Sequence, residues 1–171
     1  MKTSVLAAAV VAALVAAPSF ADGRLAKIKA SGEISLGHRD ASIPFSYLDD
    51  KQQPIGYSMD ICHEIVKAVE KNLGIEKLKV KLVPVTSSTR IPLLANGTVD
   101  LNCGSSTNTI ERQAQVAFAP TTFVTATRYV SKAADNFQKL EDLKGKTVVS
   151  TAGTSNIRWV TGANQQQTLG L

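Results

Sequence analysis

The sequence predicts an α/β fold in which helices cover a mainly parallel sheet. Strand-like and helix-like segments alternate in the order β-α-β-α-β-α between residues 33 and 113, a pattern typical of parallel sheets. Of the 171 residues, 44% are hydrophobic and 19% charged, which fits a globular domain and excludes a disordered or collagen-like chain. The three predicted strands end close to Arg39, Ser87 and Ser105, and ligands of such sheets bind beyond the strand ends.

The first 21 residues predict a secretory signal peptide. Lys2 supplies the positive charge, residues 5–17 form an apolar run, and Pro18 ends it. Small residues at positions 19 and 21 indicate cleavage after Ala21, which leaves a mature chain in the periplasm. A membrane anchor is the alternative, but the run is shorter than the roughly 20 residues that a spanning helix needs.

The elements of the next segment follow from apolar periodicity and capping residues. Asp60 is the expected N-cap of a long helix, and Asn108 with Glu111 resembles a capping box. In chain order we expect a helix at 25–28, a strand at 33–39, a loop at 44–47, a turn at 49–54, a helix from 60 to 73, a strand at 78–82, a helix at 90–95, a strand at 99–103 and a helix from 108.

The pattern of residues 121–171 predicts a second, separate unit. Residues 121–131 predict one long extended segment, and 135–145 predict a polar loop with a short helix. Residues 146–150 predict a strand, after which Ala152–Ser155 begins a second β-α unit. Residues 164–171 are polar and carry no pattern.

Several classes of function find no support in the composition. The net charge is +5 with scattered lysines, and only 5% of residues are aromatic, so no nucleic-acid partner is expected. No phosphate-binding loop, dinucleotide fingerprint, nucleophile elbow or zinc-protease motif is present in the sequence. No cofactor is therefore predicted.

Two cysteines and two histidines leave small alternatives open. The group Asp60, Cys62, His63 and Glu64 suggests a metal, although a polar helix start explains it better. Cys103 is a nucleophile only if a histidine lies beside it, and a small buried residue is the simpler interpretation. A disulfide between the two cysteines is possible in the periplasm, but spacing does not decide it. We predict no metal site and no catalytic residue.

Three arginines carry the strongest chemical signal. Ser105 to Arg112 reads as a strand end, a run of hydroxyls and a helix start, which together favour an anion. Ser87 to Arg90 repeats the arrangement, and Arg39 ends the first strand. A helix cap or a solvated arginine explains each residue alone. Convergence of all three on one edge indicates a ligand with two anionic groups.

Longer motifs resemble a known family. From about Ser31 to Ser155 the chain is similar to the periplasmic amino-acid-binding proteins of ABC importers, the family 3 solute-binding proteins, and from Arg158 onward the similarity is lost. The motifs are Gly37–Arg39, Pro44–Tyr47, Gly56–Asp60, Thr86–Leu94, Asn96–Thr98, Cys103–Asn108, Glu111–Arg112 and Leu143–Lys146.

The resemblance implies a type II periplasmic-binding-protein fold: two α/β lobes joined by hinge strands, the second lobe incomplete here. It divides the chain into a signal peptide at 1–21, a first lobe at 22–124, a hinge at 125–131 and the start of a second lobe at 132–171. Such a piece leaves apolar surface exposed, so we expect low stability and weak binding.

The same resemblance implies a binding protein for acidic amino acids. The partners would be L-glutamate or L-aspartate and an inner-membrane ABC permease, with a monomer expected for the complete protein. In this family pattern Arg112, Thr107 and Thr154 hold the α-carboxylate, Ser105 the ammonium, Arg39, Arg90 and Ser87 the side-chain carboxylate, and Phe45 and Tyr47 form an apolar wall. The alternatives are a dehydratase-like enzyme on the same fold and the sensor domain of a signalling receptor.

Overall fold

A three-stranded parallel sheet forms the centre of the larger part of the molecule. The computed structural model describes residues 20–171, so residues 1–19, which hold most of the predicted leader, lie outside the described residues. The sheet has the order β5 (Lys79–Pro84), β1 (Glu33–His38), β6 (Leu101–Cys103), and β1 pairs in parallel with both neighbours. The prediction of a mainly parallel sheet is confirmed.

The strand register brings three carboxyl ends to one edge. His38, the last residue of β1, lies opposite Pro84 on one side and Cys103 on the other. The carboxyl ends of all three strands therefore lie side by side, and the loops that follow them begin at the same edge of the sheet.

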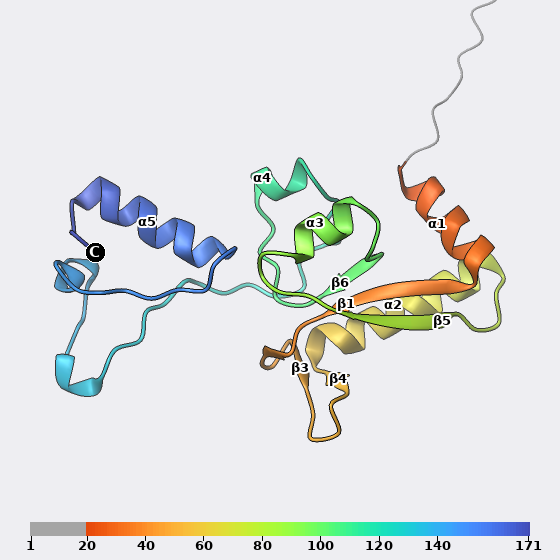
Figure 1. Cartoon of the computed structure of the whole chain (residues 1–171), viewed down its shortest axis with the longest axis horizontal. Helices are drawn as coiled ribbons and strands as arrows, with labels where there is room; N and C mark the ends of the chain where they lie inside the picture. Colours follow the sequence, from red (N-terminus) through yellow and green to blue (C-terminus); the bar gives the residue numbers. More distant parts are fainter. Residues whose placement is uncertain (1–19) are drawn as a thin grey trace, which may run out of the picture.

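A second, antiparallel sheet projects from the first. It consists of β2 (Ala41–Ser42), β3 (Ser46–Leu48) and β4 (Pro54–Ile55), in that order. Figure 1 shows it as a hairpin extending below β1. The predicted turn at 49–54 lies at the hairpin tip, whereas the predicted loop at 44–47 contains part of β3.

Two helices enclose the core against the parallel sheet. Helix α1 (Phe20–Ser31) contributes Ile28, and α2 (Tyr57–Leu73) contributes Met59, Cys62 and Val66. The eight buried residues of this cluster are Ile28, Ile34, Leu36, Met59, Cys62, Val66, Leu78 and Cys103. Cys62 and Cys103 form a disulfide, with 6.0 Å between their Cα atoms, which joins α2 to β6.

The prediction that Asp60 caps the long helix is wrong. Helix α2 starts at Tyr57, and Asp60 lies in its first turn. The amides of Tyr57 and Ser58 donate to the carbonyl oxygens of Pro44 and Phe45, at 3.0 and 2.8 Å. Because main-chain carbonyls of a distant loop satisfy these donors, the helix needs no side-chain cap.

The predicted capping box is also wrong. Helix α4 (Ile110–Gln113) takes Thr109 as its N-cap, and the Thr109 hydroxyl accepts from the Arg112 amide at 3.3 Å. The Asn108 side chain instead accepts from Gln113, and Glu111 pairs with Arg158. The short helix α3 (Arg90–Ala95) agrees with its prediction.

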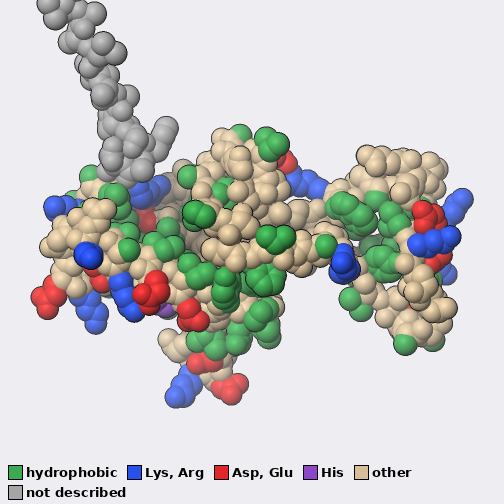
Figure 2. Space-filling view, turned by 180° about the vertical axis from the view of Figure 1, so that it is seen from behind, with side chains coloured by type: hydrophobic (Ala, Val, Ile, Leu, Met, Phe, Trp, Pro, Cys, Tyr) green, Lys and Arg blue, Asp and Glu red, His purple; other side chains and the backbone are tan. Residues whose placement is uncertain are grey.

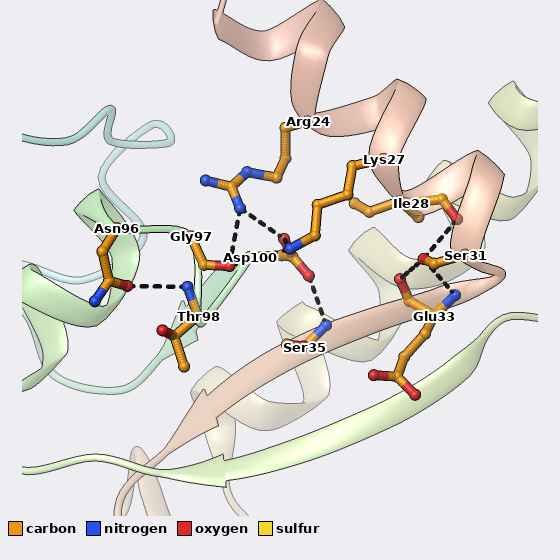
Figure 3. A network of polar contacts seen from close by, with 10 residues as sticks. All are labelled: Arg24, Lys27, Ile28, Ser31, Glu33, Ser35, Asn96, Gly97, Thr98 and Asp100. Atoms are coloured by element: carbon orange, nitrogen blue, oxygen red, sulfur yellow. Dashed lines mark hydrogen bonds and ion pairs between the residues drawn. The ribbon is translucent and has the colours of Figure 1, made fainter.

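A buried carboxylate fastens α1 to the sheet (Figure 3). The Asp100 side chain is 3% exposed and pairs with Arg24 at 3.1 Å and Lys27 at 3.8 Å. Its other oxygen accepts from the Ser35 amide of β1 at 2.8 Å. Arg24 and Lys27 also donate to the carbonyl oxygen of Gly97, so both cations bind the same loop.

Residues 132–171 form a smaller body at the carboxyl end, and the larger body comprises the elements from α1 to α4. Residues 121–131 are exposed and belong to no strand, and in Figure 1 they run between the two bodies. The smaller body contains two short 3₁₀ helices, η1 (Ala133–Asp135) and η2 (Leu140–Leu143), and helix α5 (Ser155–Gln167).

Two predictions for this body are wrong. Residues 146–150 form no strand, and Val149 is 89% exposed, because no other described strand of this body is present to pair with them. Residues 164–167, which carry no sequence pattern, continue α5. Within residues 20–171, no helix combines the length and the apolar character needed to cross a bilayer.

Candidate functional site

The end of β1 delivers Arg39 to the edge where the three strands finish. The Arg39 amide donates to Ser46 Oγ at 2.9 Å, which ties the end of β1 to β3. Its side chain donates through Nη1 to Ser87 Oγ at 3.1 Å, across to the loop that follows β5. Ser87 is itself buried, so this hydrogen bond fixes the Arg39 guanidinium against the second strand end.

Arg90, the first residue of α3, is the most unusual side chain in this region. It is 3% exposed, yet its Nε and Nη1 atoms have no hydrogen-bond partner. Burial, followed by the positive charges of Arg112 and Arg39, lowers the pKa of Arg90 to about 10. The guanidinium therefore remains protonated at neutral pH and lies in the field of two further cations, and no carboxylate among residues 20–171 forms an ion pair with it.

Arg112 is the second buried arginine of this region, at 4% exposure, whereas Arg39 is only half-buried. Its Nη1 donates to the Thr107 carbonyl at 2.8 Å, and its Nη2 donates to the Gly153 carbonyl at 3.2 Å. Burial lowers the pKa of Arg112 as well. Both partners are neutral carbonyls, so within the described part of the chain this guanidinium has no ion-pair partner either.

The loop between β6 and α4 contributes hydroxyl groups. Ser105 Oγ lies 2.7 Å from Ser42 Oγ, and Thr107 Oγ1 lies 3.0 Å from Ser155 Oγ. Thr154 is the N-cap of α5: its hydroxyl accepts from the Ile157 amide at 3.3 Å and donates to the Thr151 carbonyl at 2.7 Å. The structure thus uses the Thr154 hydroxyl for the helix start.

The smaller body approaches the arginine region through Gly153. This residue has φ +74°, and a Cβ atom there would lie 2.6 Å from Ser88 Oγ and 2.7 Å from Ser88 Cα. Only glycine combines that backbone angle with so close an approach. The loop before α5 therefore packs directly on the loop before α3.

The two aromatic residues predicted as a wall lie in different surroundings. The Phe45 ring packs edge-on against Tyr57 and Phe123, with centroids 6.2 and 4.9 Å away. Tyr47 is half-buried on β3, opposite Ala41 and Ile55. Within the described residues, no hydrogen bond joins Tyr47 to the arginines.

Sequence reasoning missed Asn102 and Gly153. Asn102 donates through Nδ2 to Ser106 Oγ at 2.8 Å, and its buried Oδ1 has no donor. The alternation of Asp100 and Asn102 within the predicted strand was the available signal, because alternate residues of a strand share a face. The role of Gly153 depends on a contact between distant loops, for which the sequence carries no signal.

The alternatives based on cysteine and metal chemistry can be compared with the geometry. Cys62 and Cys103 are joined in a disulfide, so neither provides a thiolate as nucleophile or ligand. In residues 20–171, no three residues of the metal-binding types come together. His38 is buried, with Nδ1 3.6 Å from Asp40 Oδ1, and Glu111 is paired with Arg158.

Comparisons with known proteins extend over almost the whole chain. Residues 34–166 match the family described as bacterial extracellular solute-binding proteins, family 3. The match continues past Arg158, so the expectation that the similarity ends there is wrong.

Curated relatives are similar over long alignments. The L-glutamate/L-aspartate-binding protein of Pseudomonas aeruginosa is 52% identical over 98% of this chain and 57% of its own length. The glutamate/aspartate import solute-binding protein of Salmonella typhimurium is 48% identical over 88% of this chain and 50% of its own length. The chain therefore spans about half the length of the curated relatives that it matches.

A solved structure shows the same arrangement of elements. The solute receptor for L-cysteine of Neisseria gonorrhoeae superposes with a TM-score of 0.68 at 25% identity, covering 83% of this chain and 56% of that one. The superposition covers about half of the solved structure, as the alignments cover about half of the curated relatives.

Proposed function

The chain belongs to family 3 of the bacterial extracellular solute-binding proteins, and from this membership we propose that it captures an acidic amino acid, L-glutamate or L-aspartate, for an ABC importer. The predicted α/β fold of the type II periplasmic-binding-protein kind is confirmed. In the larger body the three strand ends meet at one edge, which is where ligands of parallel sheets bind.

A single observation carries the proposal. Arg90 is almost completely buried, two of its nitrogens have no partner, and two more guanidiniums act on it. An unpaired buried charge is strongly unfavourable, whereas an entering carboxylate would provide both the counter-charge and the missing acceptors. A neutral amide would leave the charge unpaired, so the site favours a ligand with a second carboxylate.

The two ends of the ligand are assigned to separate groups of residues. Arg90, Arg39 and Ser87 bind the side-chain carboxylate, because the Arg39–Ser87 hydrogen bond already places those groups beside the second strand end. Arg112, with Thr107 and Thr154, binds the α-carboxylate. Ser105 accepts from the ammonium, and Phe45 and Tyr47 cover the aliphatic stem.

Binding without chemical turnover fits the site best. An enzyme on this fold needs a general acid or base in the cleft. His38 is enclosed beside Asp40, and Glu111 is engaged by Arg158 on the surface. We therefore propose a non-catalytic protein, and no observation favours the dehydratase or the sensor over it.

The remaining proposals concern the complete protein. It delivers its ligand to an inner-membrane permease, acts as a monomer, and reaches the periplasm after cleavage behind Ala21. Residues 22–124 form the first lobe, 125–131 the hinge, and 132–171 the start of the second lobe. The position of the 121–131 segment between the two bodies supports this division (Figure 1).

Calorimetric titration of the chain from Asp22 onward with L-glutamate, and with L-glutamine as control, tests the proposal. Heat with glutamate and none with glutamine is the expected result. Arg90→Gln keeps a polar side chain but removes the charge, and it should abolish the heat. Arg128→Gln, a change at an exposed arginine, is the matched control and should bind as the unmodified chain does.

Equal heats with glutamate and glutamine would refute the acidic-ligand proposal. Unchanged binding by Arg90→Gln would refute the assignment of Arg90 even if glutamate binds. Release of a new product from glutamate, measured by NMR, would refute the non-catalytic proposal.

A further inference from the structure

Three of the chain's aromatic rings form a cluster next to the site. The sequence has five phenylalanines, three tyrosines and one tryptophan, and Phe45, Tyr57 and Phe123 pack together. Every pair in the cluster is edge-on, with centroids 4.9 to 6.3 Å apart, a geometry that aromatic rings favour. So many rings in one place, in a chain with few, indicate a specific role.

The cluster joins three segments that are distant in sequence. Phe45 lies between β2 and β3, Tyr57 begins α2, and Phe123 belongs to the extended segment that leaves the larger body. Figure 2 shows hydrophobic side chains gathered beside the projecting hairpin. Tyr57 and Phe123 are 41% and 56% exposed, and neither belongs to the buried core cluster.

Tyr57 holds the other two segments through polar contacts as well. Its hydroxyl donates to the Thr122 carbonyl at 2.9 Å, and its amide donates to the Pro44 carbonyl at 3.0 Å. Gly56, at φ +119°, allows the close approach, because a Cβ there would lie 2.6 Å from the same Pro44 oxygen. Tyr57 is thus hydrogen-bonded both to the loop that carries Phe45 and to the extended segment that carries Phe123.

These contacts connect residues 121–131 to Phe45, one of the two residues proposed to form the apolar wall of the ligand site. Residues 121–131 are all exposed, so the contacts of Thr122 and Phe123 are well placed to hold the beginning of the segment on the larger body. The same Phe123 ring presses against Phe45 at 4.9 Å, the shortest ring contact of the three. If residues 121–124 move, the Phe45 ring therefore loses its contact with Phe123.

We infer that Phe123 and Tyr57 are positioning residues for the ligand, which set the placement of the Phe45 ring and thereby couple amino-acid binding to docking of the 121–124 segment. The inference rests on the proposed function, in which Phe45 covers the ligand's aliphatic stem. It adds two residues that do not touch the ligand, and it assigns them an effect on the length of stem that the site accepts.

The full chain tests this with paired variants. Phe123→Leu removes the ring, and Tyr57→Phe keeps the ring but removes the hydrogen bond to Thr122. Val149→Ala and Tyr129→Phe are matched controls, because Val149 is exposed and lies outside the 121–124 segment, and no hydrogen bond is formed by the Tyr129 hydroxyl within the described residues. For each chain, calorimetry gives the affinities for L-glutamate and L-aspartate, and hydrogen exchange gives the protection of residues 121–124.

Phe123→Leu should weaken glutamate binding roughly two- to tenfold, the loss expected for an edge-on ring pair. It should also change the glutamate-to-aspartate affinity ratio at least about twofold, because the two ligands differ by one methylene against the wall. A general loss of stability would lower both affinities alike. Tyr57→Phe should speed exchange at 121–124, and glutamate should slow it in the unmodified chain.

The outcomes separate the two proposals. Glutamate binding by the unmodified chain, with an unchanged affinity ratio in Phe123→Leu, overturns the positioning role and leaves the proposed function intact. Unaltered exchange at 121–124 on glutamate binding overturns the coupling. Failure of the unmodified chain to bind glutamate overturns the proposed function, and with it the positioning role.

Discussion

Arg112 bridges the two bodies of the molecule by donating to Gly153, a carbonyl 41 residues further along the chain, at 3.2 Å. The same guanidinium donates at 2.8 Å to Thr107 in its own loop. A residue assigned to the ligand's α-carboxylate thus already holds the second body in place. Under the proposed function, ligand binding and the contact between the two bodies therefore depend on the same side chain.

The close packing of Gly153 predicts a strong effect of a single methyl group. Gly153→Ala places a Cβ against Ser88 and should move the loop before α5 away from the larger body. Small-angle X-ray scattering should show a larger radius of gyration than for the unmodified chain. Gly145→Ala is the control, because it has a similar φ of +70° with no atom within 4 Å of the added Cβ. Equal scattering curves for Gly153→Ala and Gly145→Ala would contradict the packing argument.

Removal of the Arg90 charge should stabilise the chain when no ligand is present. An unpaired buried charge costs about 1–3 kcal/mol or more, and Arg90→Met fills the space with an uncharged chain. The free energy of unfolding, measured with urea, should therefore rise. Arg128→Met, at an exposed position, should leave it unchanged. A less stable Arg90→Met variant would mean that the charge has a compensating partner.

The gain from Arg90→Met should depend on pH in a defined direction. Folding lowers the pKa of Arg90 to about 10, so the folded state disfavours the protonated form. The destabilisation is present in full below that pH and fades as the pH rises from about 10 toward the ordinary arginine value. The stability difference between the two chains should be constant between about pH 6 and 9 and shrink above 10. A difference that grows with pH would reverse the assigned sign.

The disulfide between Cys62 and Cys103 should contribute a large share of stability. It closes a loop of 41 residues, for which the chain-entropy relation gives about 4 kcal/mol. Thermal unfolding with dithiothreitol should show a clearly lower midpoint than without it. The double variant Cys62→Ala, Cys103→Ala should unfold at the same low midpoint in both buffers. A midpoint insensitive to reductant in the unmodified chain would show that the bond is not formed.

The Asp100 pairing should matter more than a surface ion pair. Asp100→Asn removes the carboxylate charge from Arg24 and Lys27, and because only the Asp100 side chain is buried we expect a loss of about 1.5–3 kcal/mol, the range for hydrogen bonds to a charged group. Glu33→Gln removes the pair with Lys79 at 3.1 Å, in which the carboxylate is 31% exposed rather than 3%, and it should cost under about 1 kcal/mol. Urea unfolding of the two variants measures the difference. Similar losses would contradict the importance of burial.

The sequence predicted the parallel sheet because its signals are local and periodic. The end of the first strand next to Arg39, and the helix that begins at Arg90, could both be placed from alternation and helix-start residues. Family resemblance then added roles that no local pattern contains, such as the division of the arginines between two carboxylates.

The failures concern interactions between distant segments. Asp60 looked like a cap, but the carbonyls of Pro44 and Phe45 satisfy the helix start from another loop. Residues 146–150 have a strand composition, yet a strand also needs a partner, and no partner strand is found among the described residues. The disulfide between the two cysteines, 41 positions apart, stayed an open possibility, because spacing alone does not show that they meet.

The central position of β1 has a consequence for the order of folding. Its neighbours β5 and β6 begin 46 and 68 residues after Glu33, at Lys79 and Leu101. A chain that emerges from its amino end therefore presents β1 with both edges unpaired until residue 84 has emerged and with one edge unpaired until residue 103, and parallel pairings over such separations form slowly. Open strand edges invite pairing with other chains. During synthesis, β1, the strand that ends next to Arg39, is therefore the strand of this sheet that stays exposed to such pairing for longest.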